Sequence, residues 1–257
     1  LRSRLWNTLN MMIFQNYHQK ENRKTVVRLH NCIWSSYFKK PLEDSPPFNS
    51  RDRRKETIFD RYREYVLACP EWYEVYDFVE LIIKKSPDQW RDGLKKEINQ
   101  ILEDENAAYR IVDEEITEIS DEHEINAIEN ALHGPLCSAR KHIERSLELI
   151  SDKQNPDYRN AVKEAVSGVE SAAKEITGNS KATLADCVKQ IESAGKLHPA
   201  FKDALTKLYG YTSASGGIRH ALTEEDEPPS YSEAKYMLVV CSAFINLLSA
   251  KESEAQK

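Results

Sequence analysis

The chain has 257 residues, of which 40% are hydrophobic and 30% charged, with a formal net charge of −6. This balance is typical of a folded globular protein, and the length is sufficient for two domains of ordinary size. The negative charge excludes a protein that coats nucleic acid non-specifically, because neutralising phosphates requires clustered Lys and Arg, but it leaves room for a small local RNA site.

The first 120 residues predict a helical domain that ends in a short β-hairpin. Eight glycines and ten prolines are few for this length, which disfavours a turn-rich all-β fold, and the earliest glycine is Gly93. Residues 109–119 alternate with period two, which is typical of a hairpin. In the fourth predicted helix, apolar residues from Trp72 to Ile83 recur on one face. The predicted helices cover residues 1–18, 25–39, 52–68, 71–85 and 88–103.

After about residue 120 the composition becomes rich in alanine, serine and leucine, which predicts a domain boundary between 1–120 and 121–257. The second domain is expected to be a helical bundle with one long irregular loop, Gly210–Gly217, and such loops often carry function. The last helix is expected to start at the capping box Ser230-x-x-Glu233. The other predicted helices cover residues 121–132, 135–150, the stretch from Asn155-Pro156 to Gly178, 183–194 and 199–209. Ser120 or Asp121 is the expected N-cap of the first of these, and Asn155 that of the third, with Pro156 at the first helical position.

Two apolar stripes in this half predict a homodimer through the C-terminal domain. One is built on Val162, Val166 and Val169, and the other lies on the last helix. Together they provide more apolar surface than one small bundle needs.

The cysteines are few, and their spacing indicates neither a disulfide framework nor a metal site. They lack a C-x-x-C pair and lie in apolar helical stretches, so we expect reduced core cysteines and no bound metal. No glycine-rich phosphate loop is present, and no cofactor is expected. The five are Cys32, Cys69, Cys137, Cys187 and Cys241.

No apolar run reaches the ~18 residues needed to span a bilayer, and no signal peptide is visible. We therefore expect a cytoplasmic protein without membrane contact. The chain opens on Leu1 inside a helical pattern, without an initiator Met, so we expect further sequence to precede it.

Several stretches resemble a known family. Leu5-Trp6-Asn7, the run from Trp34 to Pro41 and the run from Glu71 to Phe78 are similar to an N-terminal domain of AbiJ-like abortive-infection proteins. The C-terminal half resembles the HEPN domain that follows in such proteins. The stretches that carry this second resemblance are 155–170, 176–178, 207–212 and 217–222.

The resemblance implies a bacterial anti-phage protein with a sensor domain, which responds to a phage-derived trigger, and a HEPN effector domain. Many HEPN domains are metal-independent ribonucleases in which an Arg holds the scissile phosphate and a nearby His moves protons. Arg219 and His220 match the start of that motif and are the candidate catalytic residues. The expected downstream His is absent, because positions 223–226 read Thr-Glu-Glu-Asp. Residues with a candidate supporting or RNA-binding role are Glu170, Tyr209, Tyr211, Gly216 and Gly217.

The residues leave other interpretations open. Arg219 could instead pair with Glu170, and the two tyrosines could fill the core. Glu170 itself could lie at the edge of its helix in water. The whole domain could be a catalytically silent HEPN module that dimerises and binds RNA, nucleotide or a partner, or a subunit that regulates a toxin. In an active dimer, Arg219 of one chain would oppose His220 of the other.

Overall fold

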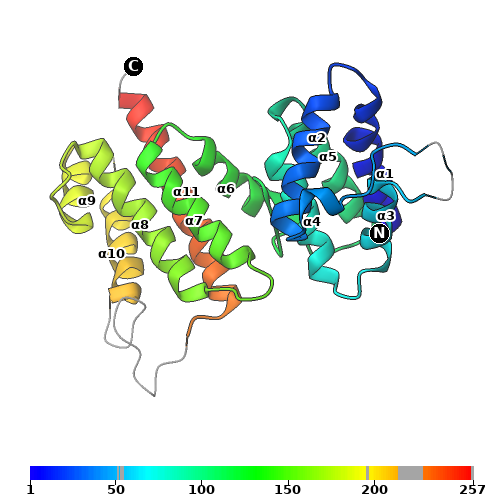
Figure 1. The fold of residues 1–257 in the computed structure, drawn as a ribbon. Helices are drawn as coiled ribbons and strands as arrows, with labels where there is room; N and C mark the ends of the chain where they lie inside the picture. The colour runs from blue at the N-terminus through cyan, green and yellow to red at the C-terminus, as the bar shows by residue number, and fades with distance from the viewer. Residues whose placement is uncertain (51, 53–54, 195–196, 214–227, 256–257) are drawn as a thin grey trace. The chain divides into compact units, whose positions relative to one another are not determined.

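The computed structural model describes residues 1–50, 52, 55–194, 197–213 and 228–255 (Figure 1). Within these residues the chain is mostly α-helical, with one small antiparallel hairpin, which confirms the predicted fold class. The chain divides into two compact units, Leu1–Glu118 and Ile119–Lys257. Each unit buries its own apolar side chains.

The first unit combines regular α-helices with short turns of other helical types. The predicted helix over 1–18 is an α-helix continued by a 3-10 turn, and that over 25–39 is an α-helix continued by a π-helical turn. The elements are α1 (Arg2–Met12), a 3-10 turn (Phe14–His18), α2 (Arg23–Cys32), a π-helical turn (Ile33–Tyr37), a 3-10 turn (Leu42–Asp44), α3 (Ile58–Ala68), α4 (Trp72–Lys85), α5 (Asp88–Asp104), β1 (Arg110–Val112) and β2 (Glu115–Thr117).

The helix predicted over 52–68 starts later than expected, at Ile58. The reason is a capping box: the backbone N–H of Asp60 donates to the Thr57 hydroxyl, and the Asp60 carboxylate accepts from the Thr57 N–H at 2.9 Å. These bonds satisfy N–H groups that the first helical turn leaves without partners, so the helix begins there.

The core of the first unit is built on large aromatic rings. Tyr62 lies between Phe14 and Phe78, with ring centroids 5.4 and 5.6 Å away, and all three are fully buried. The Tyr62 hydroxyl lies 2.8 Å from Nδ1 of buried His30, whose Nε2 lies 3.0 Å from the Ser45 hydroxyl. Burial lowers the pKa of His30 to about 4, because the charged imidazolium loses its hydration.

The apolar face predicted for α4 is mostly buried, but it does not include Trp72. Val75, Val79 and Ile83 are at most 2% exposed, whereas Trp72 is 48% exposed. Trp72 is the first residue of the helix, where its ring packs against Tyr76 and Tyr109 with one side toward solvent. Its place on the buried face was therefore wrongly predicted.

The predicted hairpin is confirmed within residues 109–119. β1 and β2 are antiparallel, with Ile111 opposite Ile116. Two side chains of the helices hold its backbone: Asn99 of α5 exchanges two hydrogen bonds with Ile111, and the Glu80 carboxylate of α4 accepts from the Ile116 N–H. The hairpin therefore completes the core of the first unit rather than standing apart from it.

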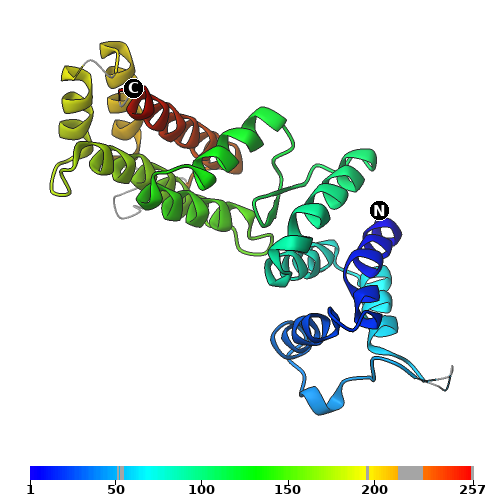
Figure 2. The same ribbon diagram turned by 90° about the horizontal axis from the view of Figure 1, so that it is seen from above.

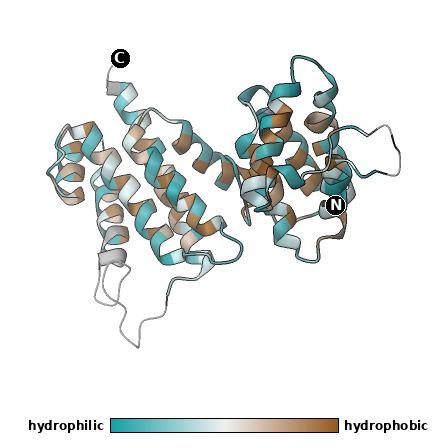
Figure 3. Ribbon diagram, in the orientation of Figure 1, coloured by the Kyte–Doolittle hydropathy of each residue, from teal (hydrophilic) through white to brown (hydrophobic). Residues whose placement is uncertain are grey.

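The second unit is a bundle around one central helix, α8, which packs against α7, α9, α10 and α11. In both ribbon views α9 and α10 stand together beside α8 (Figures 1 and 2). Figure 3 shows hydrophobic and hydrophilic residues interspersed along these helices. The elements are α6 (Glu122–His133), α7 (Cys137–Ser151), α8 (Tyr158–Thr177), α9 (Leu184–Ser193), α10 (Pro199–Ser213) and α11 (Tyr231–Ala255).

Most of the predicted helix ends in this unit are confirmed. Asp121 caps α6, Gly178 ends α8 in the left-handed conformation with φ +67, and Ser230 and Glu233 form the capping box of α11. The start of α8 differs from the prediction. Asp157, not Asn155, caps the helix by accepting from the Asn160 N–H.

α10 is longer than predicted and runs through Gly210 to Ser213. A single glycine inside a helix costs about 1 kcal/mol relative to alanine and does not by itself end the helix. The predicted loop Gly210–Gly217 therefore begins later than expected, and its remaining residues lie outside the described part of the chain.

The valine stripe that predicted a dimer is used inside the bundle. Val162, Val166 and Val169 are at most 3% exposed, and the predicted inward residues of α11, such as Leu238 and Ile245, are at most 2% exposed. The argument for a dimer from surplus apolar stripes was therefore wrong, because α8 and α11 bury these stripes within one chain. A dimer remains a prediction that needs a different surface.

α11 corrects the expectation that no segment is long and apolar enough to span a bilayer. Residues Tyr231–Glu254 meet that criterion by length and composition, with a mean hydropathy of 1.3. The core helix of a globular bundle meets the same criterion, and 44% of the apolar window is buried inside the unit.

The cysteines are reduced, but not all of them lie in the core. Cys69, Cys187 and Cys241 are buried, Cys32 is partly exposed and Cys137 is exposed at the start of α7. The prediction of a core position was therefore wrong for Cys137.

Candidate functional site

The candidate catalytic residues lie in the segment that joins α10 to α11. The structure places the candidates Tyr209 and Tyr211 in the last turns of α10, so they lead directly into this segment. The candidate residues that fall outside the described part of the chain are Arg219, His220, Gly216 and Gly217.

Glu170 lies on α8 and has a cationic partner on its own helix. Its Oε1 accepts a hydrogen bond from Nζ of Lys174 at 2.7 Å, and its side chain is 23% exposed. This i,i+4 pair agrees with the interpretation that Glu170 lies at the edge of the helix rather than in the apolar core.

Two histidines of the second unit, His142 and His198, have local partners. Nδ1 of His142 on α7 lies 2.7 Å from the Glu164 carboxylate on α8. Nδ1 of His198 accepts from the Ala200 N–H at the start of α10. Both imidazoles therefore serve helix packing and capping.

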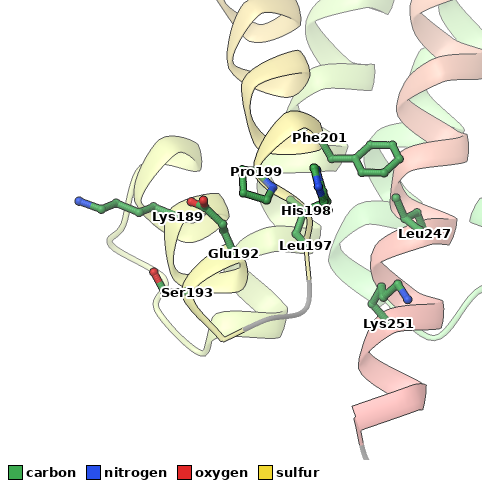
Figure 4. Close-up of a pocket in the computed structure, with 9 residues that line it drawn as sticks. All are labelled: Lys189, Glu192, Ser193, Leu197, His198, Pro199, Phe201, Leu247 and Lys251. Atoms are coloured by element: carbon green, nitrogen blue, oxygen red, sulfur yellow. The ribbon is translucent and has the colours of Figure 1, made fainter.

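An open cavity of about 680 Å³ lies at the Pro199 end of α10, away from the Tyr211 end. In Figure 4, Leu247 and Lys251 of α11 lie on one side, His198 and Phe201 in the middle, and the side chain of Lys189 points away from the others. Glu192 is paired with Lys202 at 3.1 Å, and Lys251 with Glu254 at 2.7 Å. These surface pairs do not form an acid–base arrangement around a common point.

A second, apolar groove of about 370 Å³ runs between α10 and α11. Phe201 and Tyr236, which are 53% and 58% exposed, line it, and they are the exposed large apolar side chains in the described part of this unit. The groove shares Phe201 and Leu247 with the cavity of Figure 4, so the two form one continuous surface. Such a surface is typical of a protein–protein contact.

Sequence reasoning missed a polar cluster in the first unit, where α3 ends and α4 begins. Oε2 of Glu74 accepts from the Tyr65 hydroxyl at 3.0 Å and from the Cys69 thiol at 2.9 Å. The Tyr37 hydroxyl lies 2.8 Å from that of Tyr65 and donates to the Glu74 backbone carbonyl. Burial, and for Cys69 also the nearby carboxylate, raises the pKa of Tyr37, Tyr65 and Cys69. All three groups therefore stay protonated and can donate hydrogen bonds at neutral pH.

The sequence has a basic run from Arg51 to Arg63 that is interspersed with acidic residues, which favours a solvated, salt-bridged helix face over a nucleic-acid or phage-factor patch. Arg51, Arg53 and Arg54 lie outside the described part of the chain. Arg61 pairs with Glu64 at 3.3 Å and with Glu56 at 3.5 Å, which agrees with a solvated, salt-bridged helix face. Among the described residues, no three His, Cys, Asp or Glu side chains come together as a metal-ion site.

These features define the class of protein: a mostly helical chain of two units, with an aromatic-cored N-terminal unit ahead of a helical bundle. Compared with known families, residues 1–134 match the model described as AbiJ N-terminal domain 4. The match includes the whole first unit and α6 of the second. No curated protein matches the chain, and no solved structure does.

Because the match covers more than half of its length, the chain belongs to the AbiJ N-terminal domain 4 family. It is an AbiJ-like protein, which assigns it to abortive infection, a bacterial defence against phage. Helices α7–α11 lie outside the matched residues.

Proposed function

We propose that the C-terminal unit is a HEPN effector that cleaves RNA in the cytoplasm when the N-terminal unit senses phage infection. The observation that carries the proposal is the Arg219-His220 pair, which follows Gly216-Gly217 in the segment between α10 and α11. It is supported by the helical bundle on both sides of that segment and by the AbiJ-like N-terminal unit.

In this reaction the 2′-hydroxyl of RNA attacks the adjacent phosphorus, and the 5′-oxygen of the next nucleotide leaves. Arg219 would hold the phosphate charge, and an imidazole would take the 2′-hydroxyl proton and return it to the leaving 5′-oxygen, which gives a 2′,3′-cyclic phosphate and a 5′-hydroxyl. No metal ion takes part in such a mechanism. Adjacent residues on a helix point about 100° apart, so one chain alone is poorly suited to place both groups on one phosphate.

A homodimer would complete the site, with Arg219 of one chain opposite His220 of the other. The apolar groove between α10 and α11 supports this arrangement, because exposed Phe201 and Tyr236 lie on the two helices that flank the motif segment. The proposed dimer surface is therefore this groove and not the valine stripe of α8.

To test this, wild-type protein, Arg219→Ala and His220→Ala are expressed in bacteria. Growth and RNA integrity are then measured during infection with a panel of phages. Each substitution is expected to lower RNA cleavage by about 100-fold or more, because phosphate positioning and proton transfer each contribute on that order. The matched controls are Arg145→Ala, whose guanidinium pairs with Glu148 on the surface, and His123→Ala, at an exposed position of α6. Both controls should retain activity.

Mixed dimers test the shared site directly. An Arg219→Ala chain paired with a His220→Ala chain would regain one intact site and about half of the activity. A doubly substituted chain paired with wild type would have no intact site. Light scattering would verify that each mixture is dimeric.

One observation favours a second function, a catalytically silent HEPN module that binds RNA, nucleotide or a partner. The downstream His of the motif is absent, and Glu224-Glu225-Asp226-Glu227 next to the pair would repel RNA. If wild-type protein protects against phage without cutting RNA, and the two substituted proteins protect equally well, this function replaces the enzymatic one.

A further inference from the structure

A pocket of about 360 Å³ opens in the first unit beside the polar cluster at Glu74. Its volume lies in the range of about 300–1,000 Å³ that is usual for small-molecule sites. Trp34, Phe38 and Tyr65 supply aromatic walls, and Glu74 supplies a carboxylate. Trp34 and Phe38 belong to one of the stretches by which the sequence resembles AbiJ-like proteins, and Glu74 belongs to another. Segments far apart in the chain thus meet at this pocket.

Among the described residues, the Glu74 carboxylate has no cationic partner. Its two hydrogen-bond donors, the Tyr65 hydroxyl and the Cys69 thiol, are neutral and both reach Oε2. Arg61, also at the pocket, is engaged with Glu56 and Glu64. Within the described residues, no Lys, Arg or His pairs with Glu74, and no hydrogen bond reaches its Oε1. A half-buried carboxylate in this state gains most from a ligand that brings a positive charge and N–H donors.

The aromatic wall already attracts a cation from the chain itself. The ammonium of Lys40 lies over the Trp34 ring, 5.3 Å from its centroid, and the indole Nε1–H is fixed by donating to the Pro41 carbonyl at 2.7 Å. Trp34 is only 3% exposed, so a ligand would reach its ring by replacing the Lys40 ammonium. Cations over an indole gain about 0.5–2 kcal/mol, depending on how far they are desolvated.

The backbone at this wall departs from regular structure. Trp34 lies in the π-helical turn Ile33–Tyr37, and Lys39 has a left-handed φ of 52. The N–H of Lys40 then bonds back to the Trp34 carbonyl at 3.1 Å, which brings the lysine over the pocket. π-turns and left-handed non-glycine residues cost energy and recur at ligand sites.

We propose that this pocket binds a guanidinium group, as carried by an arginine side chain in a peptide or by free arginine. The flat guanidinium stacks on the aromatic wall in place of the Lys40 ammonium, and its paired N–H groups donate to Glu74. Arginine fits better than lysine, because its planar fork both stacks on rings and bonds a carboxylate through two parallel N–H groups. The proposal concerns the first unit and is independent of RNA cleavage by the second.

The test is calorimetric titration of the full chain with L-arginine and with the tripeptide Gly-Arg-Gly, which distinguish a free from a peptide-borne guanidinium. L-citrulline and Gly-Lys-Gly are the matched probes, since citrulline keeps the shape of arginine but has no charge. We expect an arginine probe to bind at least tenfold more tightly than either matched probe.

Glu74→Gln should weaken binding of the arginine probe by tenfold or more, and Lys40→Met should strengthen it a few-fold by removing the competing ammonium. Glu71→Gln is the control. It makes the same substitution one turn away, at an exposed helix-cap position whose side chain forms no cap hydrogen bond. Thermal melting of each variant verifies the fold.

The proposal is overturned if wild-type protein binds neither arginine probe at millimolar concentration, or if citrulline binds as tightly as arginine. It is also overturned if Glu71→Gln and Glu74→Gln have the same effect, or if guanosine monophosphate, a flat base with N–H donors and no positive charge on its ring, binds more tightly. If Glu74→Gln does not fold, the comparison of arginine with citrulline and the effect of Lys40→Met still test whether the pocket binds a guanidinium group. These results do not depend on RNA cleavage, so failure here leaves the effector proposal standing.

Discussion

The cores of the two units of this protein are packed with different kinds of side chain. The first stacks large rings such as Phe14, Tyr62 and Phe78, and buries polar groups of tyrosine and histidine among them. The second packs long, regular helices through small residues, including Ala165, Gly168 and Ala172 on α8. Rings have fixed shapes, so the backbone around them is bent into 3-10 and π turns, whereas small side chains let straight helices approach closely. A polar group that bonds a buried tyrosine, the Glu74 carboxylate beside Tyr65, also lines the pocket of the first unit.

The largest expected effect on stability comes from removing a ring. Phe78 is fully buried, with its centroid 5.5–5.7 Å from those of Tyr37, Tyr62 and Tyr65. Phe78→Ala should lower the free energy of unfolding of the first unit by about 3–5 kcal/mol, from lost burial and the cavity left behind. Tryptophan fluorescence reports this unit alone, because all four tryptophans lie before residue 91. Met11→Ala, at a 62% exposed position of the same unit, is the control, and a loss below 1 kcal/mol for Phe78→Ala would contradict the ring-based account.

A smaller effect should follow from pH. The pKa of His30 is lowered from 6.5 to about 4 in the folded chain, because burial disfavours the imidazolium. Between these values the unfolded chain binds more protons, so stability is full above pH 6.5 and falls as the pH drops toward 4. The loss between pH 7 and pH 4.5 should be roughly 2–3 kcal/mol, since each unit of pKa corresponds to about 1.4 kcal/mol.

The measurement is urea unfolding followed by tryptophan fluorescence at pH 7, 6, 5 and 4.5. His30→Gln removes the titrating group, so the difference between the two pH profiles isolates its contribution from those of the carboxylates. Parallel profiles would show that His30 does not stay neutral inside the aromatic core.

Helix ends are predicted well from the sequence where a few neighbouring residues determine them. They are predicted poorly where several neighbouring residues compete or where residues distant in the sequence are in contact. The Ser230–Glu233 capping box and the left-handed Gly178 depend on a few neighbouring residues, and both are confirmed. The start of α8 was predicted at the wrong cap because acidic and amide residues compete there: Asp152 accepts from the Asn155 N–H, and Asp157 is left to cap the helix.

The same distinction applies to the candidate sites: a motif of adjacent residues can be recognised in the sequence, whereas a pocket formed by distant residues cannot. Arg219 and His220 are recognisable as a motif because they are adjacent in sequence. The pocket at Glu74 was not predicted, because its walls come from residues 34–40 and 65–74 and depend on a π-helical turn. A π turn leaves no trace in the 3.6-residue periodicity from which helices are predicted.

The smallest effect tests the close helix packing of the second unit. Gly168 on α8 faces α7, where an added Cβ would lie 3.3 Å from Cδ1 of Ile143 and 3.4 Å from the Ala139 carbonyl oxygen. Gly168→Ala should change stability little, because the gain of up to about 1 kcal/mol in helix propensity offsets the crowding. Gly168→Val should cost about 1–3 kcal/mol, since its extra methyl groups have to push α7 away.

A double-mutant cycle with Ile143 sharpens this test. Ile143→Val removes the Cδ1 atom nearest to the added Cβ and alone should cost about 0.5–1.5 kcal/mol. If the two helices touch here, Gly168→Ala combined with Ile143→Val should be more stable than the sum of the single effects by about 0.5 kcal/mol or more. Urea unfolding followed by circular dichroism measures each variant, because the second unit contains no tryptophan. Strict additivity, or a neutral Gly168→Val, would mean that α7 and α8 are not in close contact at Gly168. The two units would then differ in the type of side chain in their cores, and not in how closely their helix backbones approach.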